Sequence, residues 1–167
     1  MIAQLEHFLN YNAWANLRAI ASIRTVPVAG SKALDPLSHL LIAERFWLHR
    51  VLGLSNPEGE WATMPLDECE AYAGETHARF KAFLEGVSEG HLSGTIHYSN
   101  LKGEPFDTPL RDILTHLYTH GVHHRGQVLS AVRAEGGEPL TLDYIAFERE
   151  AWPDGCPAHR TWASGYC

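Results

Sequence analysis

The sequence predicts an all-α protein folded as a four-helix bundle. Two observations carry this prediction: four stretches of comparable length have helical hydrophobic periodicity, and proline or glycine separates them. The chain has 167 residues, which suits one compact domain and is short for two. With 45% hydrophobic and 20% charged residues, it can bury one sizeable core. We therefore expect a single domain over residues 1–167, with an irregular tail from about residue 150.

The first two helices are expected over residues 2–25 and 36–52. In the first, apolar residues recur at intervals of three and four without glycine or proline. Before the second, Asp35 is a good N-cap, and Pro36 is a residue typical of the first helical position.

A third helix is expected over residues 66–87, although two glycines weaken its pattern. The long connection before it permits a crossover between helices two and three in place of a simple hairpin. Residues 93–108 have extended character around a turn glycine and predict a small hairpin or extended segment. Residues 110–134 then give the longest uninterrupted helical pattern, and residues 143–149 a short further turn.

Charge and cysteine content narrow the classes of function. Thirteen basic against twenty acidic residues leave a formal charge of −7, which argues against a nucleic-acid or anionic-membrane surface. No stretch approaches the roughly 18 apolar residues of a membrane span, and the N-terminus does not resemble a signal peptide. Three scattered cysteines predict neither a disulfide framework nor a metal-binding pair, so we expect a cytoplasmic protein.

Histidine is concentrated in one short segment of the chain. Four of the eleven histidines, His116, His120, His123 and His124, occupy nine residues, where uniform scatter predicts about 0.6. At about 100° per residue they share an arc of about 100° on the last long helix. His120 and His124 are one turn apart and can converge on one ion, whereas His116 and His124, about 12 Å apart along the axis, are too distant to share it.

His39 is the best candidate for a third ligand. On the second helix it shares a face with Ile42, Ala43 and Phe46 and is expected to point inward, where an imidazole needs a partner. Three neutral imidazoles would not reduce the charge of a divalent ion, and they would leave one coordination position open, as in catalytic sites. Water bound there would have a lowered pKa and could act as a nucleophile, or be displaced by a thiolate.

Other interpretations of these histidines remain open at this point. His39 could be a hydrogen-bonded core residue, and the run from His116 to His124 a solvated stripe or a cluster that titrates near neutral pH. Leu114, Val122 and Leu129 lie away from the histidines, so the helix could have apolar contacts on more than one side. We favour the arrangement in which the histidines face the interior.

Several motifs in the same order resemble those of the DinB/YfiT-like family of metal-dependent enzymes. Residues 120–127, HGVHHRGQ, resemble the H-x-x-H-H-R-G-Q signature of its last bundle helix. Residues 11–16, YNAWAN, are similar to its opening motif, and residues 37–44, LSHLLIAE, to its H-x-x-x-A-E segment. Residues 142–145, LDYI, resemble its closing motif, so the likeness spans most of the chain.

This resemblance implies a four-helix bundle with a crossover between helices two and three, commonly assembled as a homodimer. It also implies a divalent metal, usually zinc or nickel, held by His39, His120 and His124. The family includes S-transferases and isomerases that use low-molecular-weight thiols, together with metal-dependent hydrolases.

Neighbouring residues are expected to support the metal ligands. His116 and His123 could orient a ligand imidazole or a substrate, and we include them among the candidate catalytic residues. Glu44 or Asp112 could bind the second ring nitrogen of a ligand histidine. Arg125 is expected to tie the last helix to an acid such as Glu44. Three side chains of the first helix could line the pocket mouth: Tyr11, Asn12 and Trp14. For Trp14 we favour the alternative of a core residue.

The leading functional hypothesis is a small metal-dependent enzyme that acts on a small molecule, either a thiol S-transferase or a hydrolase. The alternative is a non-catalytic homodimer that binds a metal or small ligand, in which the ion mainly stabilises the bundle. Neither hypothesis includes a nucleic-acid or membrane partner.

Overall fold

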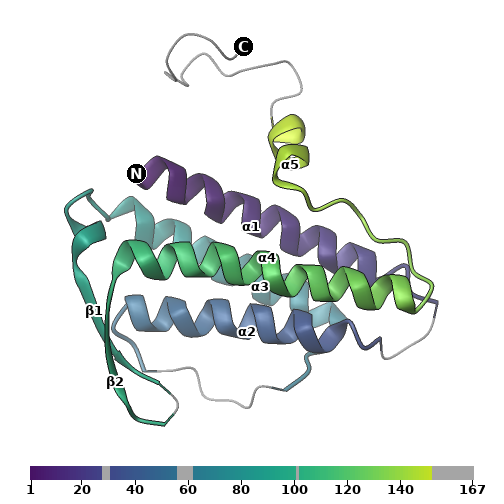
Figure 1. Ribbon diagram of the computed structural model, residues 1–167, viewed down its shortest axis with the longest axis horizontal. Coiled ribbons are helices and arrows are strands. Elements are labelled where there is room, and N and C mark those ends of the chain that lie inside the picture. Colours follow the sequence, from purple (N-terminus) through teal and green to yellow (C-terminus); the bar gives the residue numbers. More distant parts are fainter. Residues whose placement is uncertain (28–30, 56–61, 101, 152–167) are drawn as a thin grey trace.

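The computed structural model describes residues 1–27, 31–55, 62–100 and 102–151, which are mostly helical (Figure 1). The helices and strands, in chain order, are α1 (Ile2–Ile23), α2 (Leu34–Val51), α3 (Leu66–Glu85), a 3-10 turn η1 (His91–Ser93), β1 (Thr95–Ser99), β2 (Pro105–Pro109), α4 (Leu110–Ala134) and α5 (Tyr144–Ala151). Of the expected tail, residues 150 and 151 belong to α5, and residues 152–167 lie outside the described residues. No described helix is both long enough and apolar enough to cross a membrane.

The observed helices begin and end within two residues of the predicted bounds, and the difference that matters is at the start of α2. That helix begins two residues before Pro36, and its N-cap is Ala33, so the prediction of Asp35 as the N-cap is wrong. The Ser31 hydroxyl accepts the Ala33 N–H (3.1 Å) and supports the chain just before the helix. Asp35 lies in the first turn, where its carboxylate accepts a hydrogen bond from Thr63.

Two hydrophobic clusters determine the directions of the four longest described helices. The first joins the beginnings of α1 and α4 to the ends of α2 and α3; it contains Leu5, Leu48, Val51, Phe80, Leu84, Leu110 and Ile113. The second joins the opposite ends and contains Ile20, Ile23, Leu37, Leu41, Cys69, Ala73, Val128 and Val132. Helices α1 and α4 therefore run in one direction, and α2 and α3 in the other (Figure 1). Each of α1 and α2 packs against both α3 and α4.

The expected small hairpin precedes α4. Strands β1 and β2 pair antiparallel with Ile96 opposite Thr108, and Gly103 in the turn has a φ of +81°, a conformation that glycine adopts readily. Ile96 packs against the first hydrophobic cluster. The Leu110 N–H donates to the Gly94 carbonyl (2.9 Å), so the hairpin fixes the point at which α4 begins.

The last described helix, α5, folds back onto α1. Phe147 is buried against Tyr11, and His7 pairs with the Glu148 carboxylate. Trp14 Nε1 also donates to Glu150 Oε2 (2.8 Å). These contacts place α5 beside the outer face of α1, as Figure 1 shows.

Candidate metal centre

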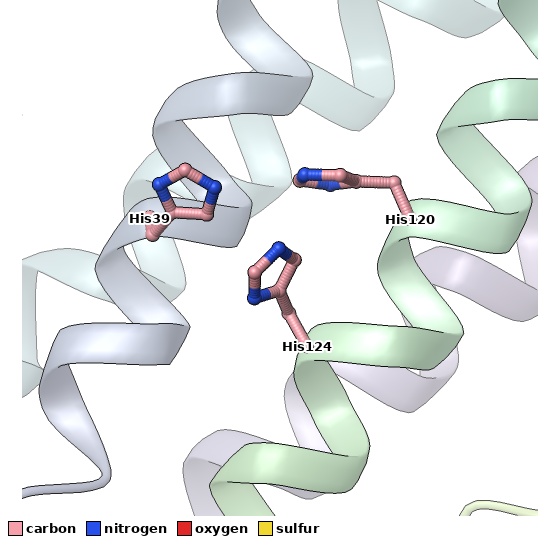
Figure 2. Close-up of side chains that lie close together, drawn as sticks. All are labelled: His39, His120 and His124. Carbon is pink, nitrogen blue, oxygen red and sulfur yellow. The ribbon is translucent and has the colours of Figure 1, made fainter.

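Three histidines from two helices meet between α2 and α4. Figure 2 shows the rings of His39, His120 and His124 turned toward one another. The ring centroid of His39 lies 4.5 Å from that of His124 and 5.5 Å from that of His120, and the two α4 rings are 4.3 Å apart. One nitrogen of each ring lies within 4.8 Å of the others, so the three could hold a metal ion. The three histidines that the sequence analysis expected to share an ion therefore lie together, and their role as ligands stays a prediction.

The three rings are half-buried at the seam between α2 and α4. The expectation that all the α4 histidines face the interior is wrong, because His116 and His123 are exposed. The buried stripe of α4 lies beside the histidines and contains Leu110, Ile113, Leu114, Leu117, Gly121, Arg125, Val128 and Val132. The residues of that stripe pack into the core. The histidines lie on the neighbouring part of the helix surface and therefore face the seam between α2 and α4.

Burial keeps the three imidazoles neutral. It lowers the pKa of His39 and His124 below the ordinary value of 6.5. The pKa of His120 falls to about 4, because burial is reinforced by repulsion from neighbouring histidines, chiefly His124. At neutral pH all three rings are therefore in the unprotonated form that a metal requires.

Gln127 orients one of the three rings. Its Oε1 accepts a hydrogen bond from Nδ1 of His124 (2.8 Å), and its Nε2 donates to Nε2 of His123 (3.2 Å). With its proton on Nδ1, His124 keeps the lone pair of Nε2 for an ion. Gln127 was not among the predicted site residues; its spacing of three residues from His124 on one helix face was the available signal.

The two carboxylates expected to orient the ligands make other contacts. Glu44 is buried in the core, where its carboxylate accepts the Asn16 amide N–H (3.0 Å). Asp112 is exposed, and its carboxylate lies 3.5 Å from Nε of Arg111. Neither acid makes the predicted hydrogen bond to a ligand histidine among these contacts. The partner of the His124 ring is Gln127 instead.

Arg125 reaches Glu44 indirectly. The guanidinium is 1% exposed and donates from Nη1 to Asn16 Oδ1 (2.9 Å) and from Nη2 to Asn12 Oδ1 (2.8 Å). Asn16 in turn donates to Glu44, so the expected link between α4 and the acid passes through an amide of α1. Burial raises the pKa of Glu44 to about 7, although the charge of Arg125 and the Asn16 hydrogen bond oppose the shift.

The residues expected at the pocket mouth lie away from the histidines. Asn12 is buried in the Arg125 network, while Tyr11 and Trp14 turn toward α5. The expectation that Tyr11 and Asn12 line the pocket mouth is wrong, because Tyr11 packs against Phe147 of α5 and Asn12 donates to the Leu117 carbonyl of α4. Trp14 packs against the same aromatic cluster, as expected for a core residue. His116 does border it, with its ring centroid 5.2 Å from that of His120 and 5.3 Å from that of Trp47.

Comparison with protein families agrees with this arrangement. The model of the DinB family matches residues 1–160, which include all three histidines and the Arg125 network. No match was found among curated proteins. The association of that family with metals fits the half-buried histidine group on α2 and α4. The chain therefore belongs to the DinB family.

Proposed function

We propose that the chain binds a divalent metal ion through His39, His120 and His124 and uses it to act on a small molecule. The observation that carries this proposal is the convergence of three neutral, half-buried imidazoles from two helices. Imidazole nitrogen suits zinc and nickel, and a set of three neutral ligands leaves the charge of the ion intact.

When bound, the ion would supply a Lewis acid that lowers the pKa of a water or thiol beside it. The residues of this chain prepare the site in other ways. Burial keeps the ligand rings unprotonated, and Gln127 holds the ring of His124 in place. His116 and His123 flank the ligands on the exposed side, where each could contact a substrate or exchange a proton with it.

The reaction we propose is either S-transfer from a low-molecular-weight thiol or hydrolysis. Family membership and the exposed flanking histidines support both branches. The alternative is a non-catalytic bundle in which the ion links α2 to α4. In either case we infer a crossover four-helix bundle, which the shared direction of α2 and α3 supports, and a homodimer.

Metal content tests the ligand assignment. Elemental analysis of untagged protein should find about one zinc or nickel per wild-type chain and sharply less in His39→Ala, His120→Ala and His124→Ala. His97→Ala is the control, because His97 is exposed on β1 and pairs with Asp107 at 2.6 Å. Equal metal content in the control and the three variants would refute the site.

Turnover separates the proposed reactions. A saturable dependence of rate on a low-molecular-weight thiol would support the transferase, and ester or amide cleavage without a thiol would support the hydrolase. Both should disappear on chelation and return with the metal. If chelation lowers only thermal stability and no thiol or ester panel is turned over, the binding module is favoured. Analytical ultracentrifugation of the same samples tests the homodimer.

A further inference from the structure

A second cavity lies on the other side of α4 from the histidines. It has a volume of about 430 Å³, is open to solvent on one side, and is lined by α1, α4, the connection that leads to α5 and the first residue of α5. At about 100° per residue, Tyr118, Arg125 and Leu129 point roughly 140–180° away from His120 around the helix axis. The cavity is therefore separate from the proposed metal centre.

A buried cation lies at the wall of this cavity. Arg125 is 1% exposed, and its Nε has no hydrogen-bond partner among the described residues. Its other nitrogens donate to the neutral amides of Asn12 and Asn16, and Glu44 is reached only through Asn16. The guanidinium is thus hydrogen-bonded by neutral groups and lacks a direct carboxylate partner among the described contacts.

The charges around the cavity favour an anion. Arg133 adds a second cation to the lining, and Asp143 is the one acid that the described lining contains. Arg133 is exposed and can present its planar set of donors to a carboxylate, whereas the buried guanidinium of Arg125 acts through its charge, which low dielectric strengthens. Two cations against one acid leave the described lining with a net positive formal charge.

Its remaining walls are aromatic and apolar. The Tyr11 ring centroid lies 5.2 Å from the guanidinium carbon of Arg125, and the rings of Tyr118 and Tyr144 lie 5.8 and 5.4 Å from Tyr11. Leu129 completes the apolar surface. Flat aromatic walls accept a flat ring, and the volume lies in the range of small-molecule sites.

We propose that this cavity is a binding site for a small aromatic carboxylate, independent of the metal. The carboxylate lies toward Arg125 and Arg133, and the ring lies against the tyrosines. The proposal does not depend on the function assigned to the histidines, because none of them lines the cavity.

Benzoate is the probe that tests it. Isothermal titration calorimetry of the full-length protein should show saturable binding, at least about tenfold tighter than that of the neutral isostere benzamide. Because a carboxylate could instead coordinate an ion, the titration is repeated after chelation and with His124→Ala. Benzoate affinity should be the same in all three samples.

Two pairs of variants locate the bound probe. Arg133→Gln should weaken benzoate binding about threefold to tenfold, while Arg111→Gln, an exposed change at the other end of α4, should not. Val122→Trp should block the cavity, of which Val122 is part, and abolish binding. Leu17→Trp is the matched control, because Leu17 and Val122 are both 45% exposed and Leu17 does not line the cavity.

Several results would overturn the proposal: no saturable binding by the full-length chain, equal affinity for benzamide, loss of binding on chelation, or unchanged binding by Val122→Trp. Circular dichroism and thermal melts of every variant confirm that each compared protein is folded. Since both tryptophan variants place the new ring on an exposed position, a difference between them reports on the cavity.

Discussion

A Cβ atom at position 121 would lie 2.7 Å from Nη1 of Arg125, so Gly121 makes room for the buried guanidinium. The same atom would lie 3.1 Å from Oδ1 of Asn12, which accepts a hydrogen bond from Arg125. The glycine is therefore required by close packing between α4 and the polar network of α1.

Replacing Gly121 by alanine should lower the free energy of unfolding by about 2 kcal/mol, because the new methyl group displaces a guanidinium confined by two amides. Gly126→Ala is the matched control on the same helix, with open space around its Cβ, and should raise stability by up to about 1 kcal/mol. Urea denaturation measures both. Equal effects would contradict the packing argument.

Glu44 should make stability depend on pH. Because its pKa in the folded protein is raised from 4.5 to about 7, the folded state favours the protonated acid. The associated stability is fully present below pH 4.5 and is lost as the pH rises through about 7. Between those values wild type should lose about 3 kcal/mol relative to Glu44→Gln, which is neutral throughout. Parallel denaturation curves at every pH for the two proteins would refute this.

The central polar network shows where sequence reasoning stopped. The one-turn spacing predicted that His120 and His124 converge, while His39 was expected to join them from its inward-facing position on the second helix and from the family resemblance. Periodicity also located α4, whose apolar stripe is regular. The route from Arg125 to Glu44 could not be predicted, since it depends on which α1 amide lies between them. That position follows from helix packing, which local patterns do not specify.

Gln127→Ala should weaken metal affinity about tenfold, because the His124 ring loses the acceptor that fixes its orientation. Gln127→Glu, which keeps an acceptor oxygen, should restore most of the affinity. Gln4→Ala, an exposed change on α1, provides the control. Competition with a chromophoric chelator measures all three. An affinity for Gln127→Ala equal to that of the control would remove Gln127 from the site.

Zinc should stabilise the wild-type fold, since the ligands lie on two different helices. At free zinc about 100 times the dissociation constant, the gain is about 2.7 kcal/mol. His120→Ala should show little of this gain in a thermal melt, whereas His97→Ala should show all of it. Stabilisation of both variants to the same extent would place the ion elsewhere.

The exposed positions of His116 and His123 show a second limit of the sequence. Helical geometry placed both residues on the same face of α4 as His120 and His124. It did not predict which side of that face lies against α2 and which is exposed to solvent. The answer depends on the rotation of α4, which is set by the buried residues Ile113, Leu117 and Val128. These three apolar residues lie next to the histidines on the helical projection of the sequence. Assigning them to the core would have predicted that the histidines face the edge of the bundle.

The second hydrophobic cluster also limits how far the chain can fold during its synthesis on the ribosome. Ile20 and Val132 belong to it although they are about 110 residues apart in the sequence. The cluster around Leu5 and Leu110 likewise needs the beginning of α4. Neither cluster can close until α4 leaves the exit tunnel, so nascent chains that lack it expose apolar faces of α1, α2 and α3. Such chains are the form in which chaperones should bind this protein.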